Sequence, residues 1–266
     1  MRILVCNDDG VEAPGIAFLA EVARKLSDDV WVVAPDGKRT AGSSSLTIAR
    51  PLTMKRLSER RYSCSGTPAD SVVTAMTWLF KDGKRPDLVL AGVNDGRNVA
   101  EDLAYSGTLG IAREATFWGI PAIGFSRVKN PRITDQDVPW LSDLIRGLWQ
   151  NRESWATEGH FLSINLPMDL PAPILQPRIG RDKIGNAAEV VSSEGDTTVI
   201  VVPRGRPHST TPGDENEAID SGHVTINRLN WFGEAPMPTD LLSALSVASF
   251  EREEPRTAKE PASEQA

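Results

Sequence analysis

The sequence predicts an α/β protein with a Rossmann-like, three-layer α/β/α fold around a mostly parallel sheet. Short apolar runs without alternation, such as Ile3–Cys6 and Val30–Ala34, are typical of strands buried on both faces. These runs alternate with helical patterns, as crossover connections between parallel strands require. Polar residues follow several of the runs, and the carboxyl ends of parallel strands meet at the edge where such folds bind ligands.

Each element has its own signal. The segment Pro14–Leu26 repeats apolar residues at helical spacing and has proline in its first turn. Thr67–Asp70 has the form of a capping box and begins a second helix. The other expected helices are Ser106–Phe117 and Asp137–Trp149. The other expected elements are a hairpin of Pro51–Leu57 and Arg61–Cys64, and strands at Asp87–Val93, Pro121–Ser126 and Phe161–Leu166.

The amino-acid composition of the chain changes after Pro167. Residues 168–236 are rich in proline, glycine and polar turns, with strand-like runs at Thr197–Val202 and His223–Ile226. Thr239–Phe250 resembles a short closing helix. We therefore expect a catalytic core over 1–167, a β-rich extension with an oligomerisation arm and the closing helix over 168–250, and a disordered tail over 251–266.

Composition narrows the function classes. The 266 residues are 40% hydrophobic, and no run approaches the ~20 apolar residues of a membrane span. We therefore expect no membrane partner, and because Asn7 interrupts the first apolar run, we expect no signal peptide. The net charge of -7 argues against binding to a nucleic-acid polymer. Cys6 and Cys64 offer no disulfide framework, which favours the cytoplasm.

Three polar segments are expected to meet at the carboxyl edge. They are Asn7–Gly10 with Asp8 and Asp9, the loop 36–45, and Asn94–Asn98. Paired carboxylates at the end of a buried strand are costly unless a positive charge neutralises them. With hydroxyl and amide oxygens nearby, they predict a hard cation such as Mg²⁺, Mn²⁺ or Ca²⁺.

A fourth segment, Ser106–Thr108, begins a helix. Unpaired backbone N–H groups and two hydroxyls at a helix start suit a phosphate. Simpler interpretations stay open: Ser106 as a plain N-cap, Asn98 as a turn residue, and Lys38 as part of a solvated loop rather than a group that steers nucleotide.

A cation beside a phosphate cradle predicts phosphoryl hydrolysis by water that the cation activates. All three histidines, His160, His208 and His223, lie outside the motif-bearing half. Neither cysteine begins a Cys-x5-Arg loop, and the paired aspartates lack Asp-x-Asp spacing. A covalent intermediate is therefore disfavoured. Asp8 and Asp9 are the candidates to accept the proton from water.

Several motifs together resemble the stationary-phase survival protein SurE family. They are Asn-Asp-Asp-Gly-Val-x-Ala-Pro-Gly-Ile at 7–16, Val-Ala-Pro-Asp at 33–36, Gly-Thr-Pro-Ala-Asp at 66–70, Asn94-x-Gly-x-Asn98 and Asp102-x-x-Tyr-Ser-Gly-Thr-x-x-x-Ala-Arg-Glu114. The resemblance implies a metal-dependent 5′-nucleotidase that removes phosphate from nucleoside monophosphates, with possible 3′-nucleotidase and polyphosphatase activity. It also implies a Rossmann-like sheet and a C-terminal arm that builds a homodimer or homotetramer.

The resemblance also assigns roles by position. It implies that one Mg²⁺ or Mn²⁺ per subunit is bound by four ligands, Asp8, Asp9, Thr40 and Asn94, with Ca²⁺ as a substitute in crystals. It implies phosphate contacts from Asn98, Ser106, Gly107 and Thr108. Thr40 stands where the family usually has serine, so Ser43–Ser45 stay alternatives for that ligand. Asp95 stands where the family more often has a small residue or histidine.

Two other functions stay open from the sequence. One is a specialised polyphosphate hydrolase. The other is a non-catalytic nucleotide or phosphate sensor, in which Thr40 and Asp95 mark a weakened site.

Overall fold

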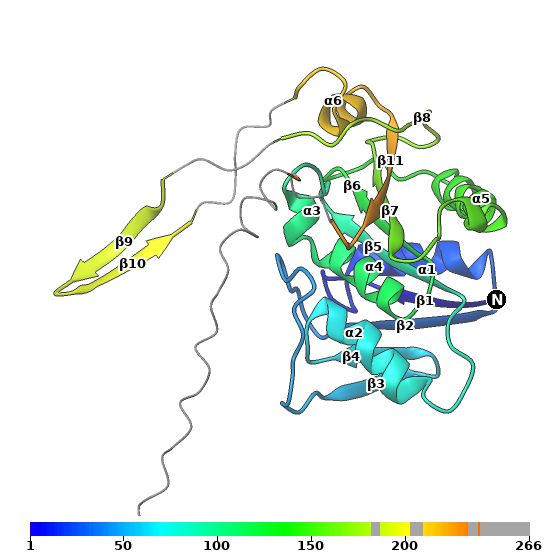
Figure 1. Cartoon of the computed structure of the whole chain (residues 1–266), viewed down its shortest axis with the longest axis horizontal. Coiled ribbons are helices and arrows are strands. Elements are labelled where there is room, and N and C mark those ends of the chain that lie inside the picture. The colour runs from blue at the N-terminus through cyan, green and yellow to red at the C-terminus, as the bar shows by residue number, and fades with distance from the viewer. Residues whose placement is uncertain (182–186, 203–209, 234–238, 240–266) are drawn as a thin grey trace, which may run out of the picture. The chain divides into compact units, whose positions relative to one another are not determined.

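The computed structural model describes residues 1–181, 187–202, 210–233 and 239. Its main sheet has nine strands in the order β3-β4-β2-β1-β5-β6-β7-β11-β8 (Figure 1). The six strands from β4 to β7 are all parallel, while β3 and β11 run antiparallel to their neighbours β4 and β7. The strands are β1 Arg2–Cys6, β2 Asp29–Pro35, β3 Met54–Ser58, β4 Arg61–Cys64, β5 Leu88–Asp95, β6 Ala122–Arg127, β7 His160–Leu166, β8 Ile174–Leu175 and β11 Val224–Asn230.

Helices cover both faces of this sheet. The pair α1 and α5 packs on one face, and the pair α2 and α4 packs on the other (Figure 1). The helices are α1 Pro14–Arg24, α2 Pro68–Thr74, α3 Asp102–Tyr105, α4 Gly107–Phe117, α5 Asp137–Gln150 and α6 Glu215–Asp220. A π-helical turn, Ala75–Leu79, extends α2. The α/β fold class predicted from the sequence is confirmed.

Strand β1 illustrates the two-sided core. Ile3 and Val5 pack toward α1 and α5, while Leu4 and Cys6 pack toward α2 and α4. All four are fully buried, and burying each large apolar side chain contributes about 1.5–3 kcal/mol. The apolar cores on both faces therefore fix the end of β1, and with it the polar residues that follow.

Several boundaries and elements differ from the sequence prediction. Strand β5 continues two residues past Val93, because a bulge at Gly92 shifts its register against β6. Gly92 has φ +121°, and a Cβ there would lie 2.2 Å from the carbonyl oxygen of Phe125. Only glycine fits this bulge. The short helices α3 and α6 and the strand β8 were not predicted.

The C-terminal half contributes to the main sheet as well as to a separate hairpin. Strand β11 pairs with β7 over six residues, from Thr225↔Asn165 to Asn230↔His160. A two-stranded hairpin of β9 Glu189–Glu194 and β10 Thr197–Val201 forms its own sheet. Residues 1–231 form one compact unit. The predicted closing helix from Thr239 and the predicted tail 251–266 lie outside the described residues, apart from Thr239 itself.

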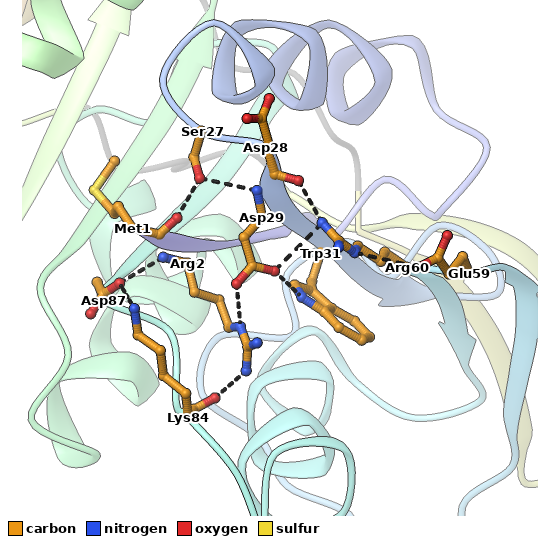
Figure 2. A network of polar contacts seen from close by, with 10 residues as sticks. All are labelled: Met1, Arg2, Ser27, Asp28, Asp29, Trp31, Glu59, Arg60, Lys84 and Asp87. Carbon is orange, nitrogen blue, oxygen red and sulfur yellow. Dashed lines mark hydrogen bonds and ion pairs between the residues drawn. The ribbon is translucent and has the colours of Figure 1, made fainter.

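A polar network joins the amino ends of β1 and β2 (Figure 2). Asp29 accepts hydrogen bonds from Arg2 Nε at 2.9 Å and from Trp31 Nε1 at 2.8 Å, and Arg60 lies 3.6 Å away. Burial by itself raises the pKa of Asp29, but the bonds from Trp31 and Arg2 outweigh burial and hold this pKa below its ordinary value. At this edge, therefore, the protein itself compensates the carboxylate charge.

Candidate active site

The turn after β1 holds two carboxylates at the carboxyl edge of the sheet. The Asn7 side chain closes this turn: its Nδ2 donates to the Gly10 carbonyl at 3.0 Å, and its Oδ1 accepts from Gly10 N at 3.2 Å. Asp8 is 6% exposed, and the side chain of Asp9 is 9% exposed. Because β1 lies between β2 and β5, the turn sits where the strand order changes direction, the usual ligand site of such sheets.

Asp8 contacts the start of helix α4. The Thr108 hydroxyl donates to Asp8 Oδ1 at 2.5 Å. A Cβ on Gly107 would lie 2.7 Å from the Cβ of Asp8, so glycine is required for this close approach. Burial raises the pKa of Asp8 to about 6, against the lowering effect of the Thr108 bond. A nearby cation would therefore strongly favour the ionised form.

Asp9 has different partners. Its Oδ1 lies 2.5 Å from the ammonium of Lys38, and its Oδ2 accepts from the backbone N–H of Asp95 at 3.0 Å. The hydrogen bond with Asp9 raises the pKa of Lys38, and the charges of Asp95 and Asp8 add to this effect. The sequence prediction gave Lys38 only as a solvated loop residue or a steering group. Its contact with Asp9 could not be read from the sequence.

The loop after β2 is joined to the Asp8–Asp9 turn by its backbone. The N–H of Arg39 donates to the carbonyl of Asp8 at 2.7 Å. Thr40 follows directly and is exposed. The backbone of Arg39, the residue before Thr40, therefore lies at the site. Among the described hydrogen bonds, none joins the Thr40 hydroxyl to Asp8 or Asp9.

The three serines of the same loop use their hydroxyls elsewhere. Ser43 Oγ donates to the carbonyl of Ala104 at 2.7 Å. Ser44 Oγ accepts from Arg113 at 2.8 Å, and Ser45 Oγ donates to a carbonyl within the loop at 2.6 Å. These bonds direct the serines toward α3, α4 and the loop itself.

Asn94 and Asn98 lie at the end of β5 and in the loop that follows. Asn94 Nδ2 donates to the Gly96 carbonyl at 2.8 Å. Asn98 is buried; its Nδ2 donates to Ser126 Oγ at 2.6 Å, and its backbone N–H donates to Asn165 Oδ1 at 2.8 Å. Asn165 Nδ2 returns a bond to the Asn98 carbonyl at 3.0 Å. Ser126 and Asn165 therefore hold Asn98 in place, and neither residue was predicted from the sequence to do so.

Helix α6 holds the chain on both sides of Asn98. The buried carboxylate of Glu215 accepts from the N–H groups of Ala100 at 2.6 Å and Gly180 at 2.7 Å, and Arg97 pairs with Asp220 at 2.9 Å. Burial raises the pKa of Glu215. The sequence Asp-Glu-Asn-Glu at 214–217 has capping-box spacing, a signal that could have located this helix.

Ser106 is the N-cap of α4. Its Oγ accepts from the N–H of Leu109 at 3.1 Å, so the plain capping interpretation holds. A capping serine and a phosphate site use the same end of the helix, because the first N–H groups of a helix lack partners within it. Gly107 and Thr108 are buried beside Asp8 and place this helix end at the site.

The donor set tests whether a metal ion fits here. Within the described ranges, no three or more His, Cys, Asp or Glu side chains gather as a metal-binding group. The available donors are two carboxylates with amide and hydroxyl oxygens, which suit a hard cation that keeps some of its waters. These oxygen donors fit a hard divalent cation, and the ammonium of Lys38, 2.5 Å from Asp9 Oδ1, would compete with it.

Fold and site together define an α/β protein with two largely buried carboxylates beside a helix N-terminus at the switch point of its sheet. The family model described as Survival protein SurE matches residues 3–189. A 5′-nucleotidase SurE of Paramagnetospirillum magneticum is 39% identical over 236 residues, covering 86% of this chain and 89% of that protein. A second, from Rhizorhabdus wittichii, is 34% identical over 241 residues, with 86% and 93% coverage.

A solved structure agrees with these relatives. The crystal structure of the SurE protein from Aquifex aeolicus matches with a TM-score of 0.72 and 27% identity, covering 93% of this chain and 99% of that one. The chain belongs to the SurE family, as the motifs in its sequence predicted.

Proposed function

We propose that this chain is a metal-dependent 5′-nucleotidase that hydrolyses nucleoside monophosphates. The observation that carries the proposal is the contact between Asp8 and Thr108. It joins a buried carboxylate with a raised pKa to the N-terminus of α4, so a cation and a phosphate would lie side by side. Membership of the SurE family, whose relatives are named 5′-nucleotidases, supports the substrate class.

We assign the cation ligands to Asp8, Asp9, Thr40 and Asn94, with Mg²⁺ or Mn²⁺ as the ion. The bonds that engage Ser43, Ser44 and Ser45 favour Thr40 over these alternatives. The Nδ2 of Asn94 bonds to Gly96, so the ligand atom of Asn94 would be its Oδ1.

The phosphate would lie against Asn98, Ser106, Gly107 and Thr108. The N-terminal N–H groups of α4 are aimed donors that stabilise negative charge as it shifts over phosphate oxygens. Ser126 and Asn165 fix the side chain and the backbone of Asn98, so this residue pays little ordering cost when substrate binds.

When bound, the divalent cation supplies charge neutralisation and lowers the pKa of a water. Asp8 or Asp9 would take the proton from the attacking water. Burial raises the pKa of Asp8 to about 6 in the metal-free protein, and a bound cation would lower this pKa again, so both aspartates stay candidates for the base.

The same proposal extends to assembly and location. We expect a homodimer or homotetramer formed through the C-terminal arm; the exposed apolar side chains on β9 and β10 support this, among them Val190 and Ile200. None of the helices in the described ranges is long and apolar enough to cross a bilayer. The buried free cysteines Cys6 and Cys64 are consistent with the reducing cytoplasm.

The test is phosphate release from 5′-AMP, 3′-AMP and tripolyphosphate, with Mg²⁺, with Mn²⁺ and with chelator. The proposal predicts metal-dependent release that is fastest from 5′-AMP. Fastest release from tripolyphosphate would favour the polyphosphatase alternative. Nucleotide binding without release under either metal would favour the sensor alternative.

A further inference from the structure

Lys38 contributes a positive charge where the proposed metal would bind. Its ammonium lies 2.5 Å from Asp9 Oδ1, with the Asp9 side chain 9% exposed and the Lys38 side chain 51% exposed. The carboxylates of Asp8 and Asp95 act on the same ammonium. One lysine thus contacts the carboxylate of Asp9, and the charges of two further carboxylates act on it.

We propose that Lys38 is an exchangeable counter-ion of this site. It neutralises Asp9 in the metal-free protein, yields Asp9 to the divalent cation, and then pairs with the phosphate of the substrate. The inference rests on the nucleotidase function proposed above and adds a residue to its substrate site.

Because the Lys38 side chain is half exposed, a divalent cation can displace its ammonium from Asp9. An ion pair that is open to water on one side is weak, and lysine carries its charge on a flexible stem. A divalent cation held by several oxygens at once therefore displaces the ammonium from Asp9. Until then, the ammonium competes with the cation for the same oxygen.

The anchoring of the loop keeps Lys38 at the site after displacement. The N–H of the next residue, Arg39, is bonded to the Asp8 carbonyl at 2.7 Å, and Asp8 contacts Thr108 at the start of α4. The backbone beside Lys38 thus stays joined to the Asp8 turn and, through Asp8, to the start of α4, where the phosphate is proposed to bind.

Charge balance favours the pairing of the displaced Lys38 ammonium with the phosphate. A divalent cation alone leaves Asp8, Asp9 and Asp95 with one unbalanced negative charge. That charge would repel a phosphate dianion, and Lys38 cancels it. The phosphate would then present oxygens to an ammonium that has lost its partner on Asp9.

The experiment measures two affinities in Lys38→Gln. Calorimetry gives the Kd of Mn²⁺ for the substrate-free protein, and inhibition of the Mn²⁺-loaded protein gives the Ki of inorganic phosphate. We expect Mn²⁺ to bind roughly three- to tenfold tighter and phosphate roughly three- to tenfold weaker. Lys38→Arg, which retains the charge, should stay near wild type, and so should Lys25→Gln, which loses the same charge on an exposed residue at the end of α1.

The outcomes distinguish a failure of the counter-ion role of Lys38 from a failure of the proposed nucleotidase function. Unchanged or weaker Mn²⁺ binding by Lys38→Gln, with normal binding by wild type, overturns the counter-ion role alone. Tighter Mn²⁺ binding with an unchanged phosphate Ki overturns the transfer to phosphate. A wild type that binds no Mn²⁺ overturns both the counter-ion role and the proposed metal site.

Discussion

At the amino edge of the sheet, Asp29 and Asp87 are surrounded by cations and hydrogen-bond donors (Figure 2), whereas at the carboxyl edge Asp8 accepts from the hydroxyl of Thr108. Asp87 accepts from Arg2 N at 2.6 Å and pairs with Lys84 at 2.8 Å. Burial by itself would raise the pKa of Asp87, but Lys84 and the Arg2 N–H outweigh it and hold this pKa below its ordinary value. Burial raises the pKa of Asp8 to about 6.

The difference distinguishes a structural carboxylate from one available to a ligand. Asp29 and Asp87 tie the starts of strands together, and their charge is already balanced by the protein. The charge of Asp8 is only partly balanced, so a bound cation would interact more favourably with Asp8 than with Asp29 or Asp87. Under the proposed function, the same residue type thus serves stability at one edge and chemistry at the other.

The largest expected effect comes from Asp9→Asn. Loss of a direct metal ligand should lower kcat/KM for 5′-AMP by more than about 100-fold, since even an outer-shell partner typically costs 10- to 100-fold. Circular dichroism should show an unchanged fold. Activity within about fivefold of wild type would remove Asp9 from the metal site.

Thr108→Val removes the hydroxyl that Asp8 accepts from, at nearly constant volume. We expect kcat/KM to fall by about 10- to 100-fold, because the carboxylate loses the bond that orients it. Thr108→Ser keeps the hydroxyl and should recover most of the activity. Equal losses in the valine and serine variants would mean that the methyl group matters rather than the hydrogen bond.

Asp8→Asn should stabilise the metal-free protein. The folded pKa of Asp8, about 6, lies above its ordinary value of 3.8, so ionising Asp8 destabilises the fold as pH rises through this window. In chelator near pH 8 the variant should gain about 1–3 kcal/mol in the free energy of unfolding, and the gain should shrink toward about pH 4. Urea titrations at several pH values measure this, and a loss of stability at about pH 8 would contradict the raised pKa.

Asp29→Asn should have the smallest effect and the opposite sign. Because the folded pKa of Asp29 is lowered, its ionised form stabilises the fold above its ordinary pKa, and this contribution disappears as the pH falls. The site is partly exposed, so we expect a loss of only about 0.5–1 kcal/mol near neutral pH, with unchanged turnover of 5′-AMP. A tenfold loss of turnover would mean that the two edges are coupled.

The sequence predicted the parts of this molecule that depend on local pattern. The continuous apolar run Ile3–Cys6, the capping box at Thr67–Asp70 and the helix start at Ser106 all appear where the pattern placed them. Each of these features is determined by residues that are close together in the sequence. The metal and phosphate assignments built on them remain predictions.

The features that the sequence did not predict depend on distant partners. Strand β11 joins the sheet through β7, Asn165 holds Asn98 from 67 residues away, and Glu215 reaches Ala100 across 115 residues. Lys38 gave no signal because a lysine in a polar loop is usually solvated. Only the folded arrangement brings its ammonium to Asp9.

The most direct test of the contrast between the two edges is the free energy of unfolding of wild type, Asp8→Asn and Asp29→Asn near neutral pH, in chelator and in Mn²⁺. Without metal, Asp8→Asn should be more stable than wild type and Asp29→Asn less stable. Mn²⁺ should stabilise wild type and Asp29→Asn and leave Asp8→Asn nearly unchanged. Equal stabilisation of all three proteins by Mn²⁺ would contradict the account, because the cation would then bind without Asp8.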